Sequence, residues 1–95
     1  MKVGIYGYGA IGRLLALTAI ERGHKVVGAV DVREDLIGKD VGSLLGVGNL
    51  GVSVSNDVSS LANADVVLHA TGSFLDKVYD QLVSIVRMGI PVVST

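Results

Sequence analysis

The segment GYGAIGR, residues 7–13, contains three glycines with the spacing G-x-G-x-x-G. In such a loop Gly7 permits a tight turn, Gly9 lets a phosphate group approach the backbone, and Gly12 lets a helix pack closely against a strand. A helix that starts directly after the loop adds free backbone N–H groups and the positive end of its dipole. The residue types and spacing therefore predict a site for the pyrophosphate of a dinucleotide.

Glycines also gather in turns for purely conformational reasons, so the prediction depends on what surrounds them. A β-rich segment, residues 2–7, precedes the helix predicted at residues 10–22. A second predicted strand, residues 25–31, ends on an acid, Asp31, which lies nineteen positions past Gly12. That spacing suits a carboxylate that accepts hydrogen bonds from an adenosine ribose.

The carboxylate of Asp31 also bears on the choice of cofactor. Its negative charge would repel a 2′-phosphate and so favours NAD, whereas Arg33, two residues later, can turn outward and accept that phosphate. NADP therefore stays possible. The alternative role for Asp31 is that of a solvated turn residue or a cap for the segment that follows.

The rest of the chain continues the alternation of strands and helices. We expect a short helix around Asp40 to Leu45, a strand at 51–55, helical turns at 57–64, a strand at 65–71, a helix at 73–89 and a strand at 90–95. Such alternation predicts right-handed crossovers and a Rossmann-type, doubly wound parallel α/β sheet with strand order 3-2-1-4-5. No linker is evident, so residues 1–95 are expected to form one dinucleotide-binding domain.

The turn after the fourth predicted strand faces the glycine loop across the carboxyl ends of the strands, where ligands of such sheets bind. Its backbone is expected to border the nicotinamide, and Ser73 can also cap the next helix. The predicted cofactor-binding residues are Gly7, Tyr8, Gly9, Ala10, Ile11, Gly12, Asp31, Arg33, Thr71, Gly72 and Ser73.

Other classes of site receive no support from the sequence. The net charge of −1 and the lack of a basic run argue against nucleic-acid binding, and the uncharged run 41–56 is shorter than the roughly 18 residues of a membrane span. Without cysteine the chain fits a cytoplasmic protein. His24 is expected at the surface and His69 in the core, without metal-ligand spacing, while Glu34 and Asp35 suit a solvated loop. We predict no catalytic or metal-binding residue.

The composition is more apolar than a small domain requires. Hydrophobic residues make up 49% of the chain and charged residues 18%, against a typical charged share of about 25%. The helix predicted at 10–22 is apolar on nearly every side up to Ile20, broken only by Arg13. We expect it to be covered by the sheet on one side and by another domain on the other, or the chain to self-associate.

Four segments, VGIYGYGAIGR, VDVREDLIGKDVGSLLG, DVVLHATGSF and GIPVVST, together resemble the N-terminal cofactor domain of the dihydrodipicolinate reductase family. They resemble its diaminopentanoate-dehydrogenase-like members more closely still. The stretch G-K-D-x-G-x-L-x-G, residues 38–46, is more specific than the glycine loop, which many dehydrogenases share. The resemblance implies an NAD(P)-dependent oxidoreductase that acts on an amine or imine carbon. The three loop glycines, Asp31 and the turn 71–73 match the family's cofactor positions.

The resemblance stops short of the family's C-terminal domain, which carries its substrate-binding and catalytic residues. The chain is therefore expected to be part of a longer protein and to catalyse nothing alone. Two alternatives stay open, namely a stand-alone NAD-sensing regulatory module and a fragment that has the fold without the function.

Overall fold

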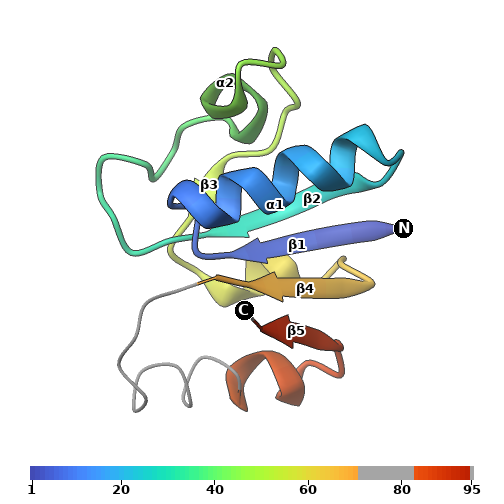
Figure 1. The fold of residues 1–95 in the computed structure, drawn as a ribbon. Helices are drawn as coiled ribbons and strands as arrows, with labels where there is room; N and C mark the ends of the chain where they lie inside the picture. The colour runs from blue at the N-terminus through green and yellow to red at the C-terminus, as the bar shows by residue number, and fades with distance from the viewer. Residues whose placement is uncertain (71–82, 95) are drawn as a thin grey trace.

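The computed structural model describes residues 1–70 and 83–94. Its strands form one parallel sheet with the order β3-β2-β1-β4-β5 (Figure 1). The strand order predicted from the sequence is confirmed. The strands are β1 (Lys2–Tyr6), β2 (Lys25–Val30), β3 (Val54–Ser55), β4 (Val66–His69) and β5 (Val92–Ser94).

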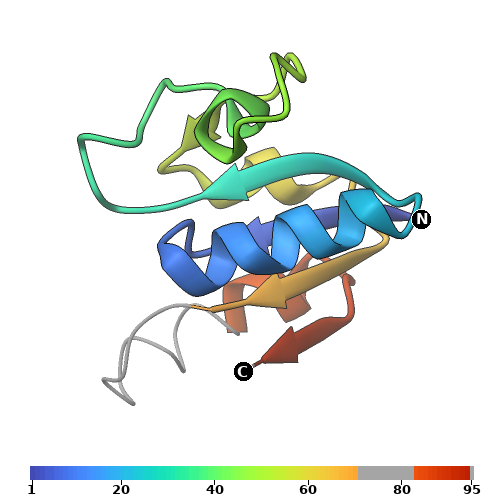
Figure 2. The same cartoon turned by 45° about the horizontal axis from the view of Figure 1, so that its top comes forward.

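Helices cover both faces of this sheet. The helix α1 (Ala10–Glu21) joins β1 to β2 on one face, while the 3₁₀ helix η1 (Val58–Leu61) and the helical residues 83–87 lie on the other (Figure 2). Successive side chains of a strand point to opposite faces. Accordingly Ile5 packs in the cluster that contains Ala16 and Ala19 of α1, and Tyr6 packs in the cluster that contains Leu61 and Ile85.

The third strand is shorter than predicted. Of the predicted strand 51–55, two residues pair with β2, because the preceding backbone pairs elsewhere. Val41 N–H donates to the Val52 carbonyl at 2.7 Å, and Ser53 forms an isolated antiparallel bridge with Asp40. The predicted short helix is confirmed as α2 (Val41–Leu45), with Asp40 as its N-cap.

Other boundaries differ by a few residues. The helical turns predicted at 57–64 contract to η1, the strand predicted at 65–71 becomes β4, which starts at Val66 and ends at His69, and the strand predicted at 90–95 starts at Val92 as β5. Thr71 and Thr95 lie outside the described residues. Residues 83–87 confirm the end of the helix predicted at 73–89, and Gly89, at φ +75°, follows it. The start of that helix, with its predicted cap Ser73, lies outside the described residues.

Asp40 organises the segment between α2 and β3. Its carboxylate accepts hydrogen bonds from the backbone N–H groups of Ser43 at 3.0 Å, Leu50 at 2.9 Å and Val52 at 3.1 Å. These bonds favour the charged form. The Leu50 N–H has the largest effect, and together they lower the pKa of Asp40.

The lowered pKa predicts a pH-dependent stability. Because the folded pKa lies below the unfolded value of about 3.9, this stabilisation is fully present above that value and is lost as the pH falls through the folded pKa. Asp40→Asn replaces an acceptor by an amide that also carries donors, so its urea midpoint should lie below that of the wild type at pH 7. The two midpoints should converge as the pH falls below about 4. Glu34→Gln, which removes an exposed carboxylate from a loop, is the control. A gap that does not change with pH would contradict this role.

Candidate functional site

The glycine loop follows β1 and lies between the carboxyl ends of β2 and β4, the two strands that flank β1. Gly7 N–H donates to the Val30 carbonyl at the end of β2, at 2.7 Å, and Ala70 N–H, just past β4, donates to the Tyr6 carbonyl at 2.8 Å. The loop after β1 is thus fixed at the carboxyl ends of the strands, at the point where the strand order reverses. Ligands of open α/β sheets bind at this switch point.

Each glycine of the loop has a different structural reason. Gly7 adopts φ +98°, a conformation that L-residues rarely take. A Cβ on Gly12 would overlap the Gly7 carbonyl oxygen, so the first turn of α1 rests directly on the loop. Among the described residues, no heavy atom lies within 4 Å of a Cβ placed on Gly9. With respect to these residues the space at Gly9 is open, as the approach of a ligand requires.

The first turn of α1 borders this open space. Gly9 is the N-cap and provides no side-chain bond, and the first turn carries no acidic residue. The first intrahelical bond joins Arg13 N–H to the Gly9 carbonyl at 2.9 Å, and Ala10 and Ile11 are exposed. Helix N–H groups ahead of that bond have no intrahelical partner, which suits them to an anion.

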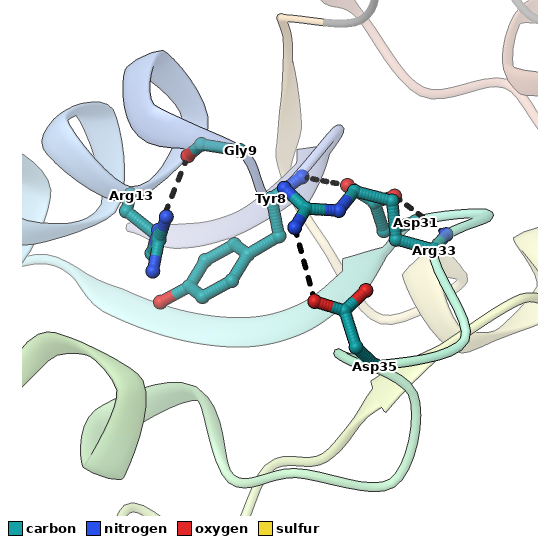
Figure 3. A network of polar contacts seen from close by, with 6 residues as sticks. All are labelled: Tyr8, Gly9, Arg13, Asp31, Arg33 and Asp35. Carbon is teal, nitrogen blue, oxygen red and sulfur yellow. Dashed lines mark hydrogen bonds and ion pairs between the residues drawn. The ribbon is translucent and has the colours of Figure 1, made fainter.

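Asp31 is buried, with 8% of its surface exposed, and both carboxylate oxygens accept backbone hydrogen bonds (Figure 3). Tyr8 N–H donates to Oδ2 at 2.6 Å, and Arg33 N–H donates to Oδ1 at 2.9 Å. The capping role that the sequence left open is therefore present. It does not exhaust the carboxylate, because each oxygen has two lone pairs and can accept a ribose hydroxyl as well.

Tyr8 anchors the glycine loop to the core through its side chain. Its side chain is fully buried, and its hydroxyl donates to the Val41 carbonyl at the start of α2, at 3.0 Å. Burial is the main cause that raises the pKa of Tyr8 to about 12. The predicted cofactor residue Tyr8 thus presents no side chain to the open space at Gly9, and ties the glycine loop to α2 instead.

Two arginines flank the loop. Arg13 is not among the predicted cofactor residues, and its Nε lies 3.4 Å from the Gly9 carbonyl oxygen in a partly buried position. The sequence signal that places Arg13 beside the loop is its position directly after Gly12. The guanidinium of Arg33 forms an ion pair with Asp35 at 3.0 Å (Figure 3).

The two histidines lie where the sequence predicts them, and the predicted nicotinamide turn lies outside the described residues. His69 is 1% exposed, with its ring 5.5 Å from that of Tyr6, which confirms a core residue, and His24 is exposed. The turn Thr71, Gly72 and Ser73 lies outside the described residues. Among the residues that are described, no group of His, Cys, Asp and Glu is arranged to hold a metal ion, and no helix is long and apolar enough to cross a membrane.

Residues 1–95 match the sequence model of the family described as "Dihydrodipicolinate reductase, N-terminus". The chain belongs to the dihydrodipicolinate reductase family. It is an N-terminal NAD(P)-binding domain of that family, as its sequence resemblance implied. The match covers the whole sequence, including the stretch 38–46.

Among the curated relatives, the 4-hydroxy-tetrahydrodipicolinate reductase of Archaeoglobus fulgidus is 44% identical over 72 residues, which are 75% of this chain and 27% of that protein. The enzyme of the same name from Acinetobacter baylyi is 36% identical over 73 residues, again 27% of its length. The matched region therefore spans about a quarter of the length of these relatives. Among solved structures, an amine dehydrogenase from Mycobacterium smegmatis aligns with a TM-score of 0.91 and 32% identity, over 99% of this chain and 29% of that one.

The geometry of the loop predicts that an alanine substitution destabilises the fold at Gly12 and is tolerated at Gly9. Gly12→Ala forces α1 away from the Gly7 carbonyl, and overpacking of this kind costs about 1–3 kcal/mol. For a domain of this size that corresponds to a fall in melting temperature of at least about 4 °C. Gly9→Ala, at an open N-cap, should cost less than about 1 kcal/mol. Thermal unfolding of both variants tests this, and an equal or reversed loss would show that α1 does not rest on the loop as described.

Proposed function

We propose that this chain is the cofactor domain of an oxidoreductase that acts on an amine or imine carbon, and that residues 1–95 form one domain of a longer protein. The names of the reported relatives support the reaction class, since two are 4-hydroxy-tetrahydrodipicolinate reductases and one is an amine dehydrogenase. The closer likeness to diaminopentanoate-dehydrogenase-like members stays a prediction.

The pyrophosphate of the cofactor binds over Gly7 to Gly12. The observation that carries this proposal is the open space at Gly9 beside an uncapped helix start. A backbone without a side chain lets the diphosphate come close, and the helix N-terminus favours its negative charge. Bound NAD(P) supplies or accepts hydride at its nicotinamide ring, and the protein's part is to hold and orient it.

The adenosine ribose lies at Asp31, whose oxygens keep lone pairs free for its hydroxyls. The negative charge of this carboxylate favours NAD over NADP. The backbone of Thr71, Gly72 and Ser73 borders the nicotinamide side, as the order of the strands leads us to expect.

The groups that bind substrate and move a proton come from outside this chain. Hydride transfer needs a substrate held within about 3 to 3.5 Å and a positioned acid or base. Among the described residues at the carboxyl ends of the strands, Asp31 and His69 are both engaged in the fold. The chain alone is proposed to be inactive.

Exposed apolar side chains on α1 support a covering partner. Ile11 is 58% and Leu14 62% exposed, on the face of α1 that is turned away from the sheet. We propose that another domain of the same protein covers them, and self-association stays a prediction. A stand-alone sensing module would need the same loop, and no observation here favours it.

Gly9→Val tests the proposed pyrophosphate site. The branched side chain fills the space that the diphosphate requires, and its Cβ meets no atom of the described residues, so the fold should persist while the affinity for NADH falls at least about tenfold. Calorimetric titration with NADH measures the affinity, and circular dichroism checks the fold.

Thr18→Val is the matched control, because it changes an exposed residue of the same helix, two turns from the loop, at nearly constant volume. It should bind NADH as the wild type does. If folded Gly9→Val also bound NADH with the wild-type affinity, the pyrophosphate would not lie at this loop.

A further inference from the structure

The loop after β2 is a fixed turn. Arg33 N–H donates to Asp31 Oδ1, and the Arg33 carbonyl accepts from the N–H groups of Leu36 at 3.1 Å and Ile37 at 3.3 Å. Leu36 is 5% exposed and belongs to the core cluster that packs under α1. The backbones of Arg33 and Asp35 are therefore held in place directly beside the proposed ribose site.

Within this turn the side chain of Arg33 is paired. Its Nη2 lies 3.0 Å from Asp35 Oδ2, and both side chains are more than half exposed (Figure 3). A guanidinium at this point of the fold, just past the ribose carboxylate, is the natural partner of a 2′-phosphate. In this chain the Asp35 carboxylate occupies the side of the Arg33 guanidinium that such a phosphate would contact.

We propose that Asp35 is a specificity-determining residue of the cofactor site, because its ion pair with Arg33 withholds the guanidinium from a 2′-phosphate, so that the site takes NAD in preference to NADP. This inference rests on the proposed function. An exposed ion pair contributes little to folding stability. Its effect on a ligand that carries an extra phosphate is larger, because the phosphate can bind the guanidinium only by displacing the Asp35 carboxylate from it.

A substitution at Asp35 tests cofactor specificity without disturbing the glycine loop, whereas a substitution at Asp31 disturbs that loop. Replacing Asp31 removes the acceptor for the Tyr8 and Arg33 N–H groups, so it disturbs the glycine loop together with the ribose contact. Within the described residues the Asp35 carboxylate bonds to Arg33 alone. Its charge can be removed without altering a backbone contact that the structure shows.

The chain also offers a matched control. Glu34 is an exposed carboxylate in the same turn, next in sequence to both partners, and it forms no ion pair within the described residues. Glu34→Gln removes the same unit charge as Asp35→Asn from nearly the same place. The difference between the two variants therefore measures the release of Arg33 rather than the general loss of negative charge.

The test is the ratio of the dissociation constants for NADPH and NADH, measured by calorimetric titration of the chain at one ionic strength. Asp35→Asn should lower this ratio by about fivefold, the size expected from the loss of one exposed ion pair. Glu34→Gln should lower it by less than about twofold. In an Arg33→Ala background, Asp35→Asn should change the ratio no more than Glu34→Gln does.

Three results would overturn the inference. Equal ratios in Asp35→Asn and Glu34→Gln would show that the pair with Arg33 does not matter. A full Asp35→Asn effect without Arg33 would show that charge alone acts. Failure of the folded wild type to bind either NADH or NADPH would overturn the proposed function, and this inference with it, whereas binding without a change in ratio overturns the inference alone.

Discussion

The first turn of α1 sits directly on the carbonyl of Gly7, and the site depends on that contact. The contact exists because Gly12 has no Cβ, which would overlap the Gly7 carbonyl oxygen. Gly7 itself adopts a positive φ, which favours glycine at that position as well. With the helix in this position, its free N–H groups lie at the carboxyl end of the sheet, beside the glycine loop that follows β1. Any larger residue at position 12 would displace the helix start, which is the feature that favours an anion.

The Asp31 carboxylate is the second constraint, because it links three parts of the site. It accepts from Tyr8 in the glycine loop and from Arg33 in the turn after β2, while it lies at the end of a buried strand. Tyr8 extends the link to α2 through its hydroxyl bond to Val41. These bonds connect the glycine loop, Asp31 and the stretch 38–46 into one structure rather than separate motifs.

The strand order, the position of the glycine loop and the burial of His69 were all predictable from local patterns. Period-two and period-3.6 patterns identify elements, and the handedness of crossovers leaves few topologies. What could not be predicted depends on side chains that are distant in sequence. The shortening of β3 follows from the bonds of Asp40 and Val41 to the segment 50–53, and the burial of Tyr8 follows from its bond to α2. The pairing of Arg33 with Asp35 needs the turn geometry, which composition does not reveal.

The start of α1 is proposed to receive the diphosphate of a dinucleotide. Chemical-shift changes of backbone amides in the ¹⁵N-labelled chain, titrated with NADH, test this most directly because each amide reports its own surroundings. We predict the largest changes at residues 9–13 and at Asp31, and small ones at residues 23–25, at the opposite end of α1. Saturating changes confined to the far end of the helix, or none at residues 9–13 at millimolar NADH, would contradict the account.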